Sequence, residues 1–358
     1  MHRGVSWRAS GRYRHRERCV VIPSVGAPLV IPSVAPKARS RGTAEIGRVP
    51  PIDSRAPFRF VVAVTDPDWF SFLSARPEIE EVNFWRPGAT TTLYQRGTPW
   101  FYLLRGTDQI VGGAFFSAYD RMPVGLAWET FQIANGAPTF DDFLRILASI
   151  KRVRPAQVGE IGCVALSQPF YFATSERIKA HRLYGPLKSF DTADSDGRAL
   201  WRELQPRMIE AARVTSASYS PPPQAPLRGS FTLVETRPGQ ATFRIDVEKA
   251  YAYRCAITGE RTRPALEAAH IVPWREARQH DVRNGLLLRS DIHNLFDAGY
   301  VTVDPDLRFV VSSAIREEFE NGRDYYALQG REIRVPVHDN QRPLNENLEW
   351  HRSNRFKG

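Results

Sequence analysis

Three side chains in the C-terminal third of the chain are of types that proton transfer and metal binding require. His270 ends the segment LEAAH, Asn284 stands in DVRNGLLL, and His293 stands in SDIHNLFDAG. Histidine has an ordinary pKa that suits proton transfer near neutral pH, and its imidazole is a common metal ligand. A lone histidine is more often a core residue, and an asparagine before glycine is by itself a turn signal. The chemical interpretation therefore depends on the ordered context.

The segments around these residues predict a strand, a loop, a second strand and a helix. Cys255 and Ile257, followed by Thr-Gly, are typical of a strand end and a tight turn. LEAAHIVPW predicts the second strand, and DVRNGLLL predicts a polar loop followed by apolar residues. SDIHNLFDAG predicts a helix that Ser290 caps and Gly299 closes. One histidine is thus expected on a strand and the other on a helix.

Residues 251–303 resemble the HNH family of ββα-metal nucleases, in the variant with CxxTG, LxAAHIxP, NGLxL and DIHxLFDxG. The resemblance implies that His270 is the general base of phosphodiester hydrolysis and that Asn284 holds the loop that orients it. It also implies that His293 binds a divalent cation, Mg²⁺, Mn²⁺ or another, which stabilises the charge of the transition state. Asp297 lies four residues after His293 on the same helix face and is a candidate second metal ligand.

One position departs from the family pattern. Many HNH enzymes carry an acidic residue or a histidine directly before the general base, as a metal ligand, whereas Ala269 stands there in this chain. Either another ligand such as Asp297 replaces it, or the metal site is weak. The sequence leaves both alternatives open. We expect His280 and Asp291 to be structural or solvated, and His351 to be structural or to contact a phosphate.

The charge of the chain is uneven. The net charge is +10, and residues 1–55 hold eleven Arg and Lys against three acidic residues, which is a net +8. This leader, with its repeated IPSV, is predicted to be disordered. A basic tail grips phosphates or is a passive extension, so basicity alone does not identify a nucleic-acid partner.

Composition limits the class of protein. No apolar run approaches the length of about 18 residues that a membrane span needs, and the scattered Cys19, Cys163 and Cys255 favour neither disulfides nor a structural zinc site. We expect a cytoplasmic protein of the α+β class. The predicted domains are the leader (1–55), an N-terminal domain (56–215), a Ser/Pro-rich linker (216–230) and the nuclease domain (231–358).

The N-terminal domain shows strand-like, aromatic-rich segments between residues 58 and 172. Helices are expected after Asp66, after Thr139 and over 196–215, and Gly106 predicts a hairpin. Residues 82–172 resemble the EVE-like branch of the PUA superfamily, small β-barrels that bind modified bases. Joined to an HNH module, the arrangement resembles modification-dependent restriction endonucleases.

A flipped base needs aromatic faces and a few fixed polar groups. Because strand residues alternate sides, Asn83 and Trp85 share one face, and we predict that both bind the base, together with Trp128 and Phe116. The alternative is that these aromatics fill the core. Gln132 stands where relatives tend to have glycine, which places the ligand in doubt.

The predicted function is an HNH endonuclease that restricts double-stranded DNA carrying modified cytosine, such as 5-hydroxymethylcytosine. One HNH site cuts one strand, so cutting both strands requires a homodimer or two binding events. One alternative is a nicking or repair nuclease that does not depend on modification. Another is a reader that binds modified DNA without cutting it.

Overall fold

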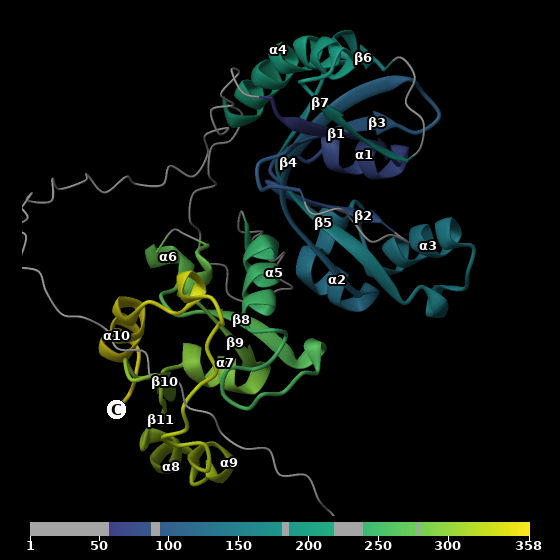
Figure 1. The fold of residues 1–358 in the computed structure, drawn as a ribbon. Coiled ribbons are helices and arrows are strands. Elements are labelled where there is room, and N and C mark those ends of the chain that lie inside the picture. The colour runs from purple at the N-terminus through teal and green to yellow at the C-terminus, as the bar shows by residue number, and fades with distance from the viewer. Residues whose placement is uncertain (1–56, 87–93, 181–185, 218–238, 278–279) are drawn as a thin grey trace, which may run out of the picture. The chain divides into compact units, whose positions relative to one another are not determined.

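The computed structural model describes residues 57–86, 94–180, 186–217, 239–277 and 280–358 (Figure 1). The chain divides into two compact units, Met1–Pro51 and Ile52–Gly358, and all described residues belong to the second. The predicted leader lies outside the described residues. The predicted linker 216–230 also lies outside them, apart from its first two positions at the end of a helix.

A mixed sheet organises the N-terminal part. Over the described residues its strands follow the order β2-β5-β4-β3-β1-β7, and β6 pairs with β4. Only β1 and β3 run parallel; the other pairs are antiparallel. Their bounds are β1 Arg59–Thr65, β2 Glu81–Arg86, β3 Pro99–Leu104, β4 Gln109–Pro123, β5 Glu160–Tyr171, β6 Ile178–Lys179 and β7 Leu187–Asp191.

This sheet is bent, but within the described residues it does not close into the predicted barrel. The long strand β4 shifts register against β5 between Gly113 and Phe115 and again between Phe116 and Ala118. Such irregularities bend a strand and increase its twist. The end strands β2 and β7 each pair with one neighbour only, β5 and β1 respectively. The described sheet is therefore an open one, and the described residues do not show the expected PUA-like barrel.

Helices begin where the sequence predicted caps. The Asp66 carboxylate accepts backbone N–H groups at the start of α1 (Pro67–Ser74), and Thr139 does the same for α3 (Phe140–Lys151). The hairpin at Gly106 joins β3 and β4 as predicted. The remaining elements here are α2 Val124–Phe131, α4 Ser195–Ala217, and the 3₁₀ turns η1 Gln132–Asn135, η2 Pro155–Gln157 and η3 Thr174–Glu176.

The C-terminal part is built on a two-stranded sheet, β8 (Leu266–His270) with β9 (Gly285–Arg289), and the helix α7 (Ser290–Asp297) that follows it (Figure 1). The strand expected near Cys255 is instead a turn, and the second strand of the pair is β9. Around this unit lie α5 Gln240–Ala250, α6 Trp274–Ala277, α8 Ala314–Phe319, α9 Arg323–Tyr326, α10 Asn345–Asn354, β10 Val301–Val303, β11 Phe309–Val311, η4 Arg263–Ala265, η5 Val282–Asn284 and η6 Asp339–Gln341.

The predicted cap of α7 is wrong by one position, whereas its end is confirmed. Arg289 occupies the N-cap, and the Ser290 hydroxyl donates instead to the Ala265 carbonyl, 3.2 Å away. Gly299 has φ +79°, and a Cβ there would lie 2.0 Å from the Arg355 carbonyl oxygen. Only glycine therefore fits this turn.

Strands of the N-terminal sheet contact α5 through buried polar groups. The Glu81 carboxylate on β2 accepts the backbone N–H of Ala241 at 2.9 Å and of Thr242 at 3.1 Å, at the first turn of α5. These donors have no partner within a helix, so a carboxylate stabilises the helix end. Burial, opposed by these hydrogen bonds, raises the pKa of Glu81.

An ion cluster holds the other half of α5. Arg263 lies 2.6 Å from the Asp120 carboxylate on β4, and its Nε lies 3.1 Å from Glu248 on α5. The Glu248 side chain is only 2% exposed, and Tyr253 donates its hydroxyl to Asp120 at 3.0 Å. Arg244 also lies 3.0 Å from Glu248. A buried carboxylate keeps its charge only with such partners, and Arg263 is the cation that joins Glu248 to Asp120.

Within the described residues, no helix has both the length and the apolar character that crossing a membrane would require.

We predict that Arg263→Met lowers the free energy of unfolding by about 3–5 kcal/mol, because the substitution removes the cation that pairs with buried Asp120 and leaves buried Glu248 with Arg244 alone. Urea denaturation followed by fluorescence measures this. The matched control is Arg261→Met, at an exposed position two residues away, for which we expect a change within about 0.5 kcal/mol. A loss below about 1 kcal/mol in Arg263→Met would show that the cluster is not buried as described.

Candidate active site

The end of β8 and the helix α7 bring two of the three predicted residues to one cleft. His270 is the last residue of β8 and pairs with Gly285, the first residue of β9. The cleft has a volume of about 690 Å³ and is lined by His270, His293, Asp297, Glu267, Phe243 and Arg244, among others. Two histidines from different elements, His270 on β8 and His293 on α7, therefore line the same cleft.

Asn284 is buried beneath this cleft and holds the backbone that follows His270. Its side-chain amide donates to the Val272 carbonyl at 2.8 Å and accepts the Val272 N–H at 2.9 Å. The Asn284 carbonyl also accepts the N–H of Ile271 at 2.9 Å. The residue is 4% exposed. A side-chain amide that bonds both backbone groups of Val272 fixes the direction in which the chain leaves β8.

The glycine after Asn284 is required by packing. Gly285 has ordinary backbone angles, with φ −124°. A Cβ at this position would lie 2.5 Å from Val247 Cγ2 and 3.0 Å from the ring of Phe243. Because α5 approaches so closely, any side chain here would displace the helix whose residues line the cleft.

His270 is held by a ring on one face and by a second histidine at its edge. The ring of Phe243, from α5, is parallel to the His270 imidazole within 11°, with centroids 3.9 Å apart. His270 Nε2 lies 3.1 Å from His280 Nδ1. The His280 contact could not be predicted from sequence, since His280 belongs to no periodic element.

His293 is flanked by two carboxylates, one on each ring nitrogen. Its Nδ1 lies 2.5 Å from Glu267 Oε2, and its Nε2 lies 3.4 Å from Asp297 Oδ2. Burial favours the neutral imidazole, but the hydrogen bond with Glu267 and the charge of Asp297 outweigh burial and raise the pKa of His293. The same hydrogen bond lowers the pKa of Glu267. The three side chains therefore form one unit, in which the charge of His293 depends on both carboxylates.

This unit fits a cation with two protein ligands. Two ligands that each lie about 2.1 Å from one ion are separated by about 3.0–3.4 Å, which agrees with the 3.4 Å between His293 Nε2 and Asp297 Oδ2. A carboxylate on the other nitrogen, as Glu267 provides, is the usual support of a metal-binding histidine. Among the described residues, no group of three or more His, Cys, Asp or Glu is arranged to hold a metal.

Comparison with protein families identifies the segment that carries this geometry. Residues 255–304 match the HNH endonuclease family model. The chain contains an HNH endonuclease domain. The match spans Cys255, β8, β9 and α7 and includes His270, Asn284 and His293. No curated protein matches the sequence.

Solved structures give distant likenesses. ZmASCH from Zymomonas mobilis, solved as two single-residue mutants, is 12% identical, and the alignments cover 40% of this chain and 94% or 96% of ZmASCH, with a TM-score of 0.27. The modification-dependent TagI restriction endonuclease is 17% identical, with a TM-score of 0.23. The alignment covers 56% of this chain and 47% of TagI.

Within the HNH endonuclease domain, Ala269 does not face the cleft. It is fully buried, in the core between β8 and its neighbours, so no ligand is expected from that position. Glu267, three residues before His270, is the acidic residue of β8 that reaches His293. The sequence pattern does not indicate Glu267 as a partner of His293, because strict alternation along a strand places positions three apart on opposite faces.

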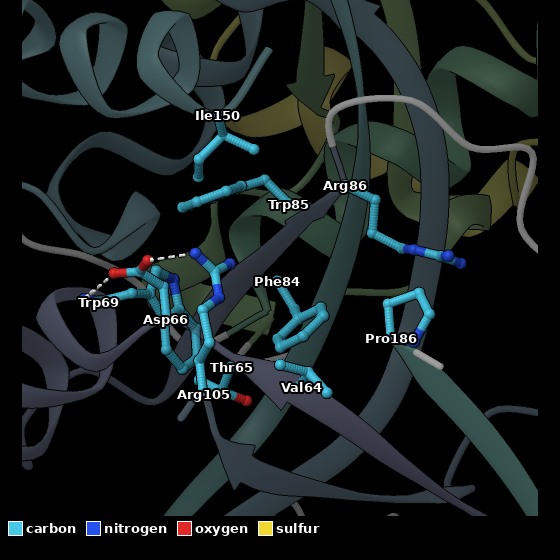
Figure 2. Close-up of a pocket in the computed structure, with 10 residues that line it drawn as sticks. All are labelled: Val64, Thr65, Asp66, Trp69, Phe84, Trp85, Arg86, Arg105, Ile150 and Pro186. Atoms are coloured by element: carbon cyan, nitrogen blue, oxygen red, sulfur yellow. Dashed lines mark hydrogen bonds and ion pairs between the residues drawn. The ribbon is translucent and has the colours of Figure 1, made fainter. Parts of the chain in front are cut away.

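The N-terminal sheet holds a separate cavity of about 290 Å³ (Figure 2). Its lining is mostly apolar and aromatic, with Trp69, Phe84, Trp85 and Ile150. Asp66 and Arg105 supply polar groups at its edge, 3.3 Å apart, and Arg86 also lines it. Trp85 is thus the one predicted base-binding residue that lines this cavity.

The other three predicted base-binding residues pack elsewhere. Asn83 is fully buried, and its amide donates to Asn135 Oδ1 at 2.8 Å. Trp128 packs against Phe140 and Phe143, and Phe116 is 4% exposed in the core. In this structure, therefore, Asn83, Trp128 and Phe116 support the fold around the cavity and do not line it.

Gln132 adopts backbone angles that favour glycine. Its φ is +47° and its ψ is −130°, and both angles are unusual for a residue with a side chain. The sequence departure noted at this position is therefore accompanied by local strain, and Gln132 lies on the rim of the cleft that holds His270.

His351 also borders this cleft, and its environment makes it structural. Its ring stacks on Phe296 with centroids 3.7 Å apart, and its nitrogens contact the Thr302 hydroxyl at 2.9 Å and the Phe296 carbonyl at 3.0 Å. Burial lowers the pKa of His351 to about 4. Folding therefore favours the neutral imidazole.

We predict that stability falls as the pH drops from about 6.5, the ordinary histidine value, towards about 4, because the unfolded chain binds the His351 proton first. The loss attributable to this group is about 3 kcal/mol over that range. Urea denaturation of the wild type and of His351→Gln across the range isolates the contribution. An equally steep pH dependence in His351→Gln would contradict the assignment.

Proposed function

We propose that this chain is a metal-dependent endonuclease that cuts double-stranded DNA carrying modified cytosine, such as 5-hydroxymethylcytosine. The observation that carries the proposal is the cleft of the HNH endonuclease domain, where His270 lies with His293 and Asp297. An HNH endonuclease acts on DNA. Dependence on a modified base is the further step, and the N-terminal cavity supports it.

In the proposed reaction His270 takes a proton from a water molecule that attacks the phosphodiester. Asn284 keeps His270 in place through its two hydrogen bonds to Val272. His293 and Asp297 would hold a divalent cation, Mg²⁺ or Mn²⁺, which supplies stabilisation of the charge that develops on the phosphate. Arg355 lines the same cleft and provides positive charge for the DNA backbone, whereas Arg244, which also lines it, pairs with Glu248 at 3.0 Å.

The proposed reader is the cavity beside Trp85. Recognition of a base outside the duplex requires an aromatic face and a few polar groups for the base edge. The cavity offers aromatic faces from Trp85 and Phe84 and polar groups from Asp66 and Arg105. The lining of the cavity is mostly apolar and aromatic, which suits a planar ring. Arg86 and Arg105 at its edge suit the phosphates that flank an extruded base.

One experiment separates this proposal from its alternatives. The protein is incubated with phage DNA containing 5-hydroxymethylcytosine and with unmodified DNA, each with Mg²⁺ or EDTA, beside a His270→Ala variant. We expect cutting of the modified DNA only, and none with EDTA or His270→Ala. Equal cutting of both substrates would support a nuclease that ignores modification. Binding without cutting in every condition would support a reader.

Two substitutions test the cavity. We predict that Trp85→Ala, which removes an aromatic face, and Ile150→Trp, which fills the space, each weaken binding of modified DNA by about 10- to 100-fold, since stacking contributes about 1–3 kcal/mol per base. Ile209→Trp, at an exposed position on α4, is the control. Competition binding with modified and unmodified duplexes measures the preference, and thermal melting verifies folding. An undiminished preference in Ile150→Trp would exclude this cavity as the reader.

A further inference from the structure

A second histidine contacts the proposed general base. His280 lies in the segment after α6, ten residues beyond His270, and its Nδ1 is 3.1 Å from His270 Nε2. The mechanism above does not use it. The contact nevertheless constrains what His270 can do, because a hydrogen bond between two imidazoles must contain one donor and one acceptor.

The two ways of placing that proton differ in their chemical consequence. If His270 donates through Nε2–H, the neutral ring has its lone pair on Nδ1, which can take a proton from water. If His280 donates through Nδ1–H, then neutral His270 carries its proton on Nδ1 and cannot act as a base there. Only the first tautomer is productive for a base that uses Nδ1.

The surrounding packing keeps the two rings in this arrangement. Phe243 lies flat on His270, and the Trp274 ring is within 25° of the plane of His280, with centroids 6.0 Å apart. On another side of His280, a Cβ added at Gly239 would lie 3.1 Å from its Cδ2. Neither ring is therefore positioned by the hydrogen bond alone, and the contact is built into the cleft.

We propose that His280 is a positioning residue, which accepts the Nε2–H of His270 and thereby keeps its Nδ1 ready to receive a proton. In the hydrolytic step, an O–H bond of water breaks and an N–H bond forms at His270 Nδ1. The hydroxide oxygen bonds to phosphorus, and the bond from phosphorus to the leaving oxygen breaks. The leaving oxygen takes a proton from solvent. The resulting imidazolium keeps its Nε2–H bonded to His280, which stabilises the charge.

This inference rests on His270 being the base of the proposed function. The proposed function and the positioning role of His280 can be contradicted by different experiments. Normal cutting by His270→Ala would contradict the proposed function, whereas the His280 variants below test only the positioning role.

Isosteres of the two ring nitrogens provide a sharp test. Asparagine at position 280 places its amide oxygen near the Nδ1 position, whereas glutamine places its amide near the Nε2 position, away from His270. Leucine keeps the size without an acceptor.

We expect His280→Leu and His280→Gln to cut saturating DNA about 10- to 1,000-fold more slowly in single-turnover assays, because general base catalysis contributes about 10²–10⁴-fold. DNA affinity should be unchanged, and His280→Asn should recover most of the rate. Wild-type rates in His280→Leu would overturn the proposal, as would an equal loss in folded His280→Asn.

The tautomer itself can be observed without any cleavage assay. Nitrogen-15 NMR of histidine-labelled wild-type protein, with His270 assigned by substitution, distinguishes a protonated from an unprotonated ring nitrogen. We expect the proton of neutral His270 on Nε2. A neutral His270 that carries its proton on Nδ1 would overturn the proposal whatever the variants do.

Discussion

The candidate active site depends on the packing of one aromatic ring, that of Phe243, against the imidazole of His270. Phe243 fixes the plane of that imidazole, and Phe243 belongs to α5, which is held at its start by Glu81 and further along by the cluster of Arg263, Glu248 and Asp120. Glu81 and Asp120 lie on strands of the N-terminal sheet. The orientation of the proposed base is therefore determined by residues distant in sequence from the nuclease motif.

The core of the site was predictable from sequence because its geometry is local. His270, Asn284 and His293 lie on β8, η5 and α7 within one short segment. The pairing of His270 with Gly285, the residue after Asn284, brings the first two together. Asp297 was predictable from helix periodicity alone. Glu267 and His280 were not, since Glu267 reaches His293 across the sheet from a position that strand alternation assigns to the other face, and His280 reaches His270 from a segment without periodicity.

On strand β2 of the N-terminal part, the alternation of side chains does not distinguish residues of the cavity from residues of the core. On β2, the residues from Val82 to Trp85 are all buried, so both faces of the strand are packed. Alternation then cannot separate a cavity from a core, and Phe84 lines the cavity whereas Asn83 does not. Whether a sheet closes into a barrel likewise depends on pairing between its edge strands, which the pattern of a single sequence does not encode. Helix caps at Asp66 and Thr139 were predictable because they involve only neighbouring backbone groups.

Chemical rescue tests the central claim, that His270 is the base of a hydrolytic site. In His270→Gly the ring is removed and its space beside Phe243 is opened, so that free imidazole can enter. The rate of DNA cleavage by His270→Gly is then measured against imidazole concentration, with Asn284→Ala as the comparison. If His270 is the base, His270→Gly should not cut DNA without imidazole, and its rate should rise with imidazole concentration. Asn284→Ala should show no such rise. Cutting by His270→Gly at the wild-type rate without imidazole would contradict this role of His270.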